Sequence, residues 1–271
     1  MARIITLLTD FGVESTYPAQ MKGVILARRP DALLVDMSHG VPPHDVHTAA
    51  FMLASAAPAF PEGTVHLTVV DPGVGGSRRV LAAEAGGRFH VAPDNGVLTL
   101  VAQGRRLFGP EAEPAAVVAV QDETHYRRDV SSTFHGRDMF APLAAALAGG
   151  VDLDSLGPRL DDFQRFPLPL PRRHGQTIRG QVLYVDPFGN LVTNVSGRML
   201  EAVDASRVEI HVSGAVIRGL CRAYGDVPPG ILLAYIGSAG LVEVAVNLQS
   251  AAVRLGAGRG TPLTVHLPPA S

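Results

Sequence analysis

The stretch from Val65 to Arg79 reads Val-His-Leu-Thr-Val-Val-Asp-Pro-Gly-Val-Gly-Gly-Ser-Arg-Arg. Its first six residues, up to Val70, are mainly apolar and β-branched, and a carboxylate, a proline and three glycines follow at once. This pattern predicts a buried strand that ends at a polar crevice. Asp71 would lie at the carboxyl end of the strand, where open α/β sheets bind ligands, with Arg78 within reach of the same crevice. Taken alone, the segment is equally compatible with a turn-capping aspartate and a solvated arginine pair.

The chain leading into this strand alternates between strand-like and helix-like patterns. The predicted elements are, in order, a strand at 4–8, a helix at 18–29, a strand at 33–37, a helix at 45–57 and a strand at 64–70. This order predicts an α/β domain with a largely parallel sheet flanked by helices. Because parallel strands end at a common edge, the pattern brings Asp10, Asp36 and Asp71 toward one edge of the sheet.

The first domain continues beyond this alternation. Strand patterns at 89–92 and 117–120 and a helix pattern at 139–147 complete it. We therefore expect an N-terminal α/β domain over residues 1–163.

A change of composition then marks a second domain. Three alternating prolines in 163–173 favour an extended linker, placed at residues 164–176. Beyond it, strand patterns separated by glycine-rich turns lie at 180–185, 208–212, 231–235, 241–246 and 263–267. These short strands predict a small antiparallel barrel or sandwich over residues 177–271.

Composition narrows the class of partner. The chain has 271 residues, of which 46% are hydrophobic and 18% charged, and its formal net charge is −2. This charge gives no electrostatic reason to expect nucleic acid or an anionic membrane, so a small molecule is the expected partner. Cys221 is the only cysteine, which excludes an internal disulfide and a thiolate zinc site. Neither a signal-peptide pattern nor an apolar run of about 20 residues is present, and a cytoplasmic protein is expected.

Two loops of the first domain carry groups suited to a ligand. Asp10 follows the first strand, where a carboxylate can hold a ribose diol through two hydrogen bonds, although it could equally cap a turn. The loop 131–138 combines hydroxyls, the imidazole of His135 and a charge pair before a helix. A single histidine of this kind is more often a structural hydrogen-bonding residue than a catalyst.

The second domain contains a comparable set. Asp186, Phe188 and Asn190 follow a predicted strand and offer a carboxylate, an aromatic face and a carboxamide. These groups suit an ammonium, a flat heterocycle and its polar edge, although the same segment could be a simple hairpin turn. The glycine-rich turn before Glu243 and Asn247 has the same two interpretations.

A metal site is an alternative use of the polar residues. The candidate ligands share carboxylate or imidazole chemistry and are Asp10, Asp36, His39, His44, His47 and Asp71. None of the usual metal-binding spacings is present among them, so no metal is expected.

In their order along the chain, these motifs resemble the S-adenosylmethionine (SAM) hydroxide adenosyltransferase family, the hydrolytic relatives of bacterial fluorinase and chlorinase. The matching segments are Leu8–Gly12, Met21–Leu26, Val70–Gly75, Ala92–Gly96, Thr133–Asp138, Asp186–Asn194 and Gly237–Gly240. They cover both domains and nearly the whole chain.

The resemblance implies an α/β domain, a barrel-like domain and a homotrimer whose ligand lies between one subunit's first domain and its neighbour's second. It implies no cofactor and a catalytic set formed by Asp71, Arg78 and His135. The substrate-binding residues follow from the same resemblance or from the motifs around it: Asp10 for the ribose, Asp186 and Ser238 for methionine, Phe188, Asn190 and Asn247 for the adenine side, and Glu243 nearby.

The implied activity is hydrolysis of SAM to adenosine and L-methionine. Halogenating relatives carry an arginine where this chain has Ala239, and a further loop after the segment that ends at Gly96; both are missing here. The run 13–17 also departs from the family, because it has no aspartate. A halogenase that forms 5′-halo-adenosine and a non-catalytic adenosine-binding or SAM-binding module are the alternatives.

Overall fold

The computed structural model describes residues 4–102, 116–201 and 203–268. The chain divides into two compact units, the first reaching Phe166 and the second continuing from Pro167. This division falls inside the segment 164–176 that the prolines mark as a linker. In the part of the chain that is described, no helix is long and apolar enough to cross a bilayer.

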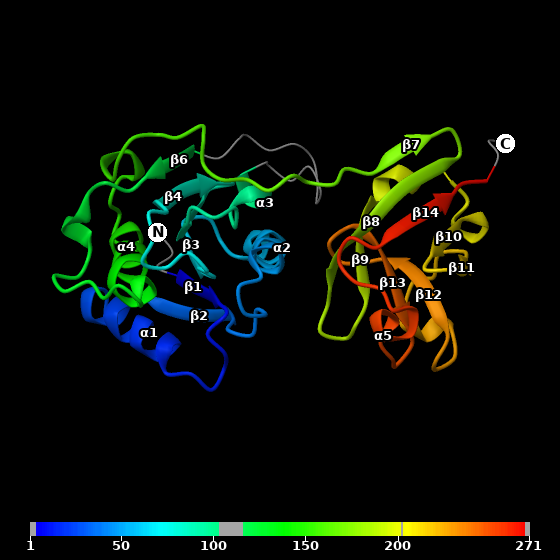
Figure 1. Cartoon of the computed structure of the whole chain (residues 1–271), viewed down its shortest axis with the longest axis horizontal. Helices are drawn as coiled ribbons and strands as arrows, with labels where there is room; N and C mark the ends of the chain where they lie inside the picture. The colour runs from blue at the N-terminus through cyan, green and yellow to red at the C-terminus, as the bar shows by residue number, and fades with distance from the viewer. Residues whose placement is uncertain (1–3, 103–115, 202, 269–271) are drawn as a thin grey trace. The chain divides into compact units, whose positions relative to one another are not determined.

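The first unit is a six-stranded sheet in the order β2-β1-β3-β5-β4-β6, with helices beside it (Figure 1). The strands are β1 (Ile4–Thr9), β2 (Leu33–Ser38), β3 (Val65–Val69), β4 (Val80–Ala85), β5 (Arg88–Pro93) and β6 (Ala116–Ala119). The helices are α1 (Tyr17–Arg28), α2 (Val46–Ala56), α3 (Thr99–Ala102) and α4 (Ala141–Ala148), with a π-helix, η3 (Gly136–Phe140), directly before α4. Short 3₁₀ turns lie at Ala57–Ala59, Glu123–His125 and Leu153–Ser155.

Alternating side chains of the central strands define the two faces of this sheet. Val65, Leu67 and Val69 of β3 belong to a core shared with α1 and α4. The intervening residues His66 and Thr68 are also buried and point to the opposite face, as the two-residue period of a strand requires. The α1 and α4 helices pack against each other, and α2 packs against β1 and β3 (Figure 1).

The predicted parallel core is confirmed, since β1 pairs in parallel with β2 and β3, and β3 with β5. The sequence patterns did not predict β4, which forms an antiparallel hairpin with β5 through Gly86 and Gly87. Asp10 directly follows β1 and Asp71 lies two residues beyond the end of β3, and both are near one edge because Thr9 lies opposite Val69. Asp36 differs: it lies within β2, opposite Leu7.

The second unit is an antiparallel, nearly closed sheet in the order β11-β10-β14-β8-β9-β13-β12, with β7 paired to β8 (Figure 1). Its strands are β7 (Arg172–His174), β8 (Thr177–Val185), β9 (Leu191–Ser196), β10 (Glu209–Val212), β11 (Ala215–Arg218), β12 (Leu232–Ile236), β13 (Leu241–Val246) and β14 (Pro262–His266). The helical elements are α5 (Ala251–Leu255) and 3₁₀ turns at Gly197–Leu200, Ala205–Arg207 and Tyr224–Asp226. The edge strands β11 and β12 approach each other, which gives the barrel-like form expected for this domain.

Candidate active site

The centre of the first unit's polar edge is a paired carboxylate and guanidinium. Arg78 donates from Nε and from a terminal nitrogen to Asp71 Oδ2, at 2.9 and 2.6 Å, and Nε lies 3.2 Å from Oδ1. Both side chains are more than nine-tenths buried. Oδ1 is therefore the less engaged oxygen of Asp71 and keeps lone pairs free for another donor.

His135 completes this group from a distant part of the chain. Its Nδ1 lies 2.6 Å from the same terminal nitrogen of Arg78. A guanidinium can only donate, so Nδ1 accepts and the neutral ring carries its proton on Nε2. Burial, reinforced by the charge of Arg78, holds the pKa of His135 below its ordinary value. The predicted residues Asp71, Arg78 and His135 thus meet in one cluster, with an imidazole that can donate from Nε2.

Glycine allows the two loops of this cluster to meet. Gly75 has φ +78°, and a Cβ placed there would lie 2.6 Å from the carbonyl oxygen of Ser132. Any other residue would be strained in this backbone conformation and would also push the loops apart. Gly75, one of the three glycines after the strand, therefore lets the loop of Arg78 approach the loop of His135.

Asp138 anchors the loop that carries His135. Its fully buried carboxylate accepts Arg137 Nε at 2.7 Å, a terminal nitrogen of Arg137 at 2.9 Å, and the backbone N–H of Ser131 at 2.9 Å. Burial opposes ionisation here, but the hydrogen bonds from Arg137 and Ser131 hold the pKa of Asp138 below its ordinary value. The charge pair in this loop is visible in the sequence, but its anchoring role was not predicted.

Asn95 supports the other side of the cluster. Its Nδ2 donates to the carbonyl oxygen of Val70, at 2.8 Å, directly before Asp71. Its neighbour Asp94 is buried and accepts from Arg79 Nε and from the backbone N–H of Gln164, both at 2.7 Å. The segment 94–95 therefore fixes the end of β3.

Asp10 lies beside this edge with its own backbone contact. Its carboxylate accepts the backbone N–H of His44 at 2.8 Å, and the side chain is about one-tenth exposed. His44 adopts φ +66°, which turns its N–H toward Asp10. Three aromatic rings lie next in the chain to Asp10 or pack on its neighbour: Phe11, Tyr17 and Phe134 contact each other edge to face.

The residues considered as metal ligands are engaged in separate contacts. Asp36 pairs with Lys22 Nζ at 2.6 Å and lies 3.0 Å from His39 Nε2. Burial acts to raise the pKa of Asp36, but the hydrogen bonds from Lys22 and His39 outweigh it and keep this pKa below its ordinary value. His47 stacks on Phe166. Within the described residues, no three histidine, cysteine or acidic side chains gather as a metal site would require.

In the second unit, Asp186 organises the turn between β8 and β9. Its Oδ1 accepts the backbone N–H groups of Phe188 and Asn190, at 2.9 and 2.8 Å, and its Oδ2 accepts Asn190 Nδ2 at 2.7 Å. These bonds leave lone pairs on Oδ2, so the carboxylate can still accept from a ligand.

A pocket of about 590 Å³ opens beside this turn. Phe188, Asn190 and Asn247, the residues expected on the adenine side, all line it, together with Tyr224 and others. Phe188 is largely exposed, whereas Asn190 is buried except toward the pocket. The volume lies within the range of about 300–1,000 Å³ that is usual for small-molecule sites.

Glu243 is joined to this pocket through hydrogen-bonded side chains. Asn190 Nδ2 donates to the Tyr224 hydroxyl at 3.0 Å, the two hydroxyls of Tyr224 and Tyr235 lie 2.6 Å apart, and Tyr235 donates to Glu243 at 2.5 Å. Burial raises the pKa of Glu243. The negative charge of Asp186 adds to this shift, and the hydrogen bond from Tyr235 opposes it. The two tyrosines were not predicted, because no motif marked them.

Ser238 lies in the exposed turn between β12 and β13. The preceding Gly237 leaves room for Glu243, since a Cβ there would lie 1.8 Å from Glu243 Oε1. Hydrogen bonds therefore connect Asp186, Asn190 and Glu243, whereas Ser238 lies in the exposed turn and is close to Glu243 in the sequence.

Comparisons with known proteins identify the family of the chain. The family model of the SAM hydroxide adenosyltransferase N-terminal domain matches residues 5–157, and that of the C-terminal domain matches residues 180–264. An (R)-S-adenosyl-L-methionine hydrolase from Thermus thermophilus is 41% identical over 96% of this chain and 98% of its own length. A fluorinase from Nocardia brasiliensis is 30% identical over 92% of each chain. The crystal structure of an uncharacterised Thermotoga maritima protein has a TM-score of 0.88 at 36% identity, covering 97% of this chain and 99% of that one. This chain is a member of the SAM hydroxide adenosyltransferase family.

Proposed function

We propose that this chain hydrolyses SAM to adenosine and L-methionine by attack of an activated water on C5′. The observation that carries the proposal is the Asp71–Arg78–His135 cluster, in a chain 41% identical to an (R)-S-adenosyl-L-methionine hydrolase. The oxygen of water forms the new bond to C5′, and the C5′–S bond breaks with its electron pair going to the methionine sulfur.

The chemistry assigns each member of the cluster a task. The sulfonium makes methionine a neutral leaving group, so the enzyme acts on the nucleophile, for which positioning alone supplies about 7–11 kcal/mol in favourable cases. Asp71 Oδ1 accepts a proton from water, Arg78 stabilises the developing hydroxide, and the Nε2 proton of His135 fixes the water oxygen. In this proposal no metal or cofactor takes part, and exhaustive chelation with EDTA should leave turnover unchanged.

Substrate binding is divided between the two units. Asp10 holds the ribose hydroxyls, Asp186 and Ser238 hold the methionine amino and carboxylate groups, and the pocket beside Phe188 receives adenine. The connected contacts of Asp186, Asn190 and Glu243 support this assignment, because one group of side chains can present both an acceptor and an aromatic face.

We further propose a homotrimer that works in the cytoplasm, with each site completed by a neighbouring subunit. Inactive Asp71→Ala and Asp186→Ala subunits mixed into hybrid trimers should then regain activity, because some sites combine two intact halves. Verified hybrids that remain inactive would contradict the shared site but leave the hydrolysis itself untouched.

The direct test is to incubate the purified protein with SAM and separate the products by chromatography. Adenosine and L-methionine in equal amounts, in chloride and in fluoride buffers alike, are the expected products. A 5′-halo-adenosine as the main product would indicate a halogenase. Stoichiometric binding with no turnover over hours would indicate a binding module.

A further inference from the structure

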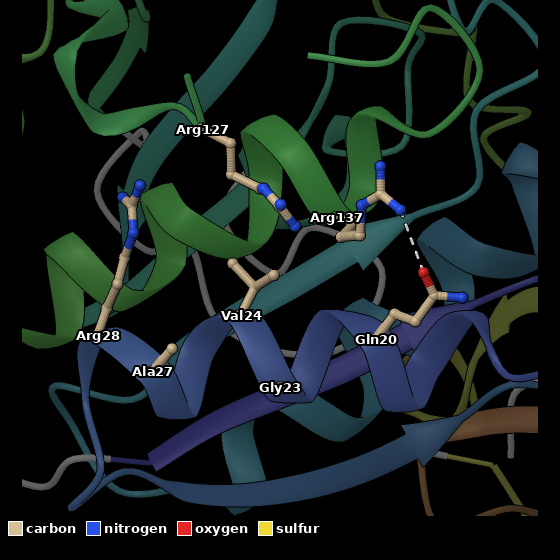
Figure 2. Close-up of a pocket in the computed structure, with 7 residues that line it drawn as sticks. All are labelled: Gln20, Gly23, Val24, Ala27, Arg28, Arg127 and Arg137. Carbon is tan, nitrogen blue, oxygen red and sulfur yellow. Dashed lines mark hydrogen bonds between the residues drawn. The ribbon is translucent and has the colours of Figure 1, made fainter. Parts of the chain in front are cut away.

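A second pocket, lined in part by arginines, lies in the first unit along the exposed side of α1. Its volume is about 430 Å³. Figure 2 shows Gln20, Gly23, Val24 and Ala27 along one face of α1, with three arginine side chains around them. These arginines are Arg28, Arg127 and Arg137.

The positive charges of this pocket exceed its negative ones. Within the described part of the chain, Asp138 is the one carboxylate that forms an ion pair with any of the three arginines. Each side-chain nitrogen of Arg137 already has a partner, because two of them donate to Asp138 and the third donates to Gln20. Among the residues described, three guanidinium groups therefore share one carboxylate, which leaves an excess of two positive charges.

Arg127 has donors left for a ligand. Its Nε lies 3.4 Å from Asp138 Oδ1, its side chain is about two-fifths exposed, and Figure 2 shows the guanidinium pointing down toward α1. Arg28 donates to the backbone carbonyls of His125 and Tyr126, and these two bonds fix its position at one end of the pocket. Burial, and then the charge of Arg127, lowers the pKa of Arg28, as expected for cations held close together.

The floor of the pocket leaves space for an occupant. A Cβ at Gly23 would meet no atom within 4 Å, and Ala27 adds only a methyl group. A planar fork of N–H donors above a small-residue floor matches the bidentate geometry with which arginine binds phosphate and carboxylate groups.

We propose that this pocket is a binding site for a small oxyanion, a phosphate or carboxylate group, held by Arg127 and Arg28 and separate from the Asp71–Arg78–His135 cluster. The site does not depend on the proposed hydrolysis, since no residue of that cluster lines it. Its link to the cluster is Asp138, which pairs with Arg127 and also anchors the loop of His135.

The test is calorimetric titration of the full chain with pyrophosphate, inorganic phosphate and succinate at constant ionic strength. We expect saturable binding of at least one probe. Tighter binding of pyrophosphate or phosphate identifies a phosphate ligand, and tighter binding of succinate identifies a carboxylate ligand. The variant Arg127→Gln should weaken binding roughly tenfold or more, as for the loss of a charge-assisted bond. Arg128→Gln, which removes the same charge from an exposed neighbour outside the pocket, should change it less than about twofold.

A steric variant separates the pocket from general charge effects. Gly23→Leu keeps every arginine and fills the floor, so it should abolish binding, whereas Ala19→Leu on the same helix should not. Thermal unfolding of each variant verifies that it is folded. The proposal is overturned if no probe binds saturably, if Arg127→Gln and Arg128→Gln bind alike, if Gly23→Leu binds normally, or if adenosine displaces the probe.

Discussion

The two units hold their functional groups in opposite ways. In the first unit, Arg78 joins an ionised carboxylate to a neutral imidazole, and all three groups can change charge or stabilise one. In the second, hydroxyl and amide groups connect Asn190 to the buried Glu243. Charge close to the reacting atoms favours catalysis, while neutral hydrogen bonds favour a fixed shape. We therefore expect substitutions in the Asp71–Arg78–His135 cluster to lower turnover and those in the group that joins Asp186 to Glu243 to weaken binding.

The largest expected effect is at Asp71. Asp71→Asn keeps the shape of the side chain but removes the proton acceptor, so kcat should fall by about 10²–10⁴-fold. KM should change by only a few fold, because the lost interaction matters as the nucleophile gains charge. The measurement is steady-state release of adenosine.

Asp162→Asn is the matched control for this change. Asp162 is an exposed carboxylate paired with Arg79, next in sequence to Arg78. Its loss should leave kcat within about twofold of the parent value. An Asp71→Asn variant with a raised KM and an unchanged kcat would show that Asp71 only holds substrate.

The units should also respond differently to acid. His66 and His90 are buried and stacked in the first unit, and burial lowers the pKa of His66 to about 4 and that of His90 well below its ordinary value. Between pH 6.5 and 4 the unfolded chain binds more protons, so the free energy of unfolding falls as the pH falls. The slope is about 1.4 kcal/mol per pH unit for each histidine.

Hydrogen exchange, corrected for the intrinsic effect of pH, measures this difference. Protection of β5 should decline through this window while that of β13 stays nearly constant, because no histidine of the second unit is buried among its described residues. His66→Leu should flatten the decline. Equal loss of protection in both units would contradict the assignment to buried histidines.

The same contrast explains how far the sequence predicts this molecule. The parallel core was predicted because β1 and β3 are apolar runs that end abruptly in polar residues. The β4 and β9 strands were not predicted: β4 begins directly after two arginines, and β9 lies inside a polar motif that could be a loop. Tertiary pairing, rather than local pattern, defines both strands.

For the candidate site, local motifs indicated which residues matter but not how they are held. Asp138 and Tyr235 were not assigned their roles, because the contacts that define them join loops and strands far apart in the chain. Arg78 and His135, for example, are 57 residues apart. A buried anchoring carboxylate and a surface charge pair look the same in a sequence.

Asp138 provides the next test, since Arg159 and Asp154 form an exposed pair of nearly the same geometry. The two N–O distances are 2.7 and 2.9 Å in the buried pair with Arg137, and 2.7 and 2.8 Å in the exposed one. Asp138→Asn should lower the free energy of unfolding by about 2 kcal/mol, because a buried charged bond is lost. Asp154→Asn should lower it far less, because an exposed ion pair is screened by solvent and contributes little to stability.

Urea unfolding measures both changes, and kcat provides a second comparison. Asp138→Asn should also reduce kcat, since the loop of His135 loses its anchor, while Asp154→Asn should not. Equal destabilisation by the two substitutions would show that burial does not distinguish these pairs.

The smallest expected effect lies in the second unit, at Tyr235. Tyr235→Phe removes the hydroxyl that joins Tyr224 to Glu243. The amide of Asn190 then loses the row of hydrogen-bonded side chains that holds Tyr224 in place beside it. KM should rise roughly tenfold, about 1.4 kcal/mol of binding, while kcat stays within about threefold of the parent value. Tyr126→Phe, which removes a hydroxyl from a buried tyrosine of the first unit, should leave KM unchanged. If Tyr235→Phe lowers kcat at constant KM, the second unit takes part in the chemical step, and the division between a catalytic cluster in the first unit and a binding group in the second is wrong.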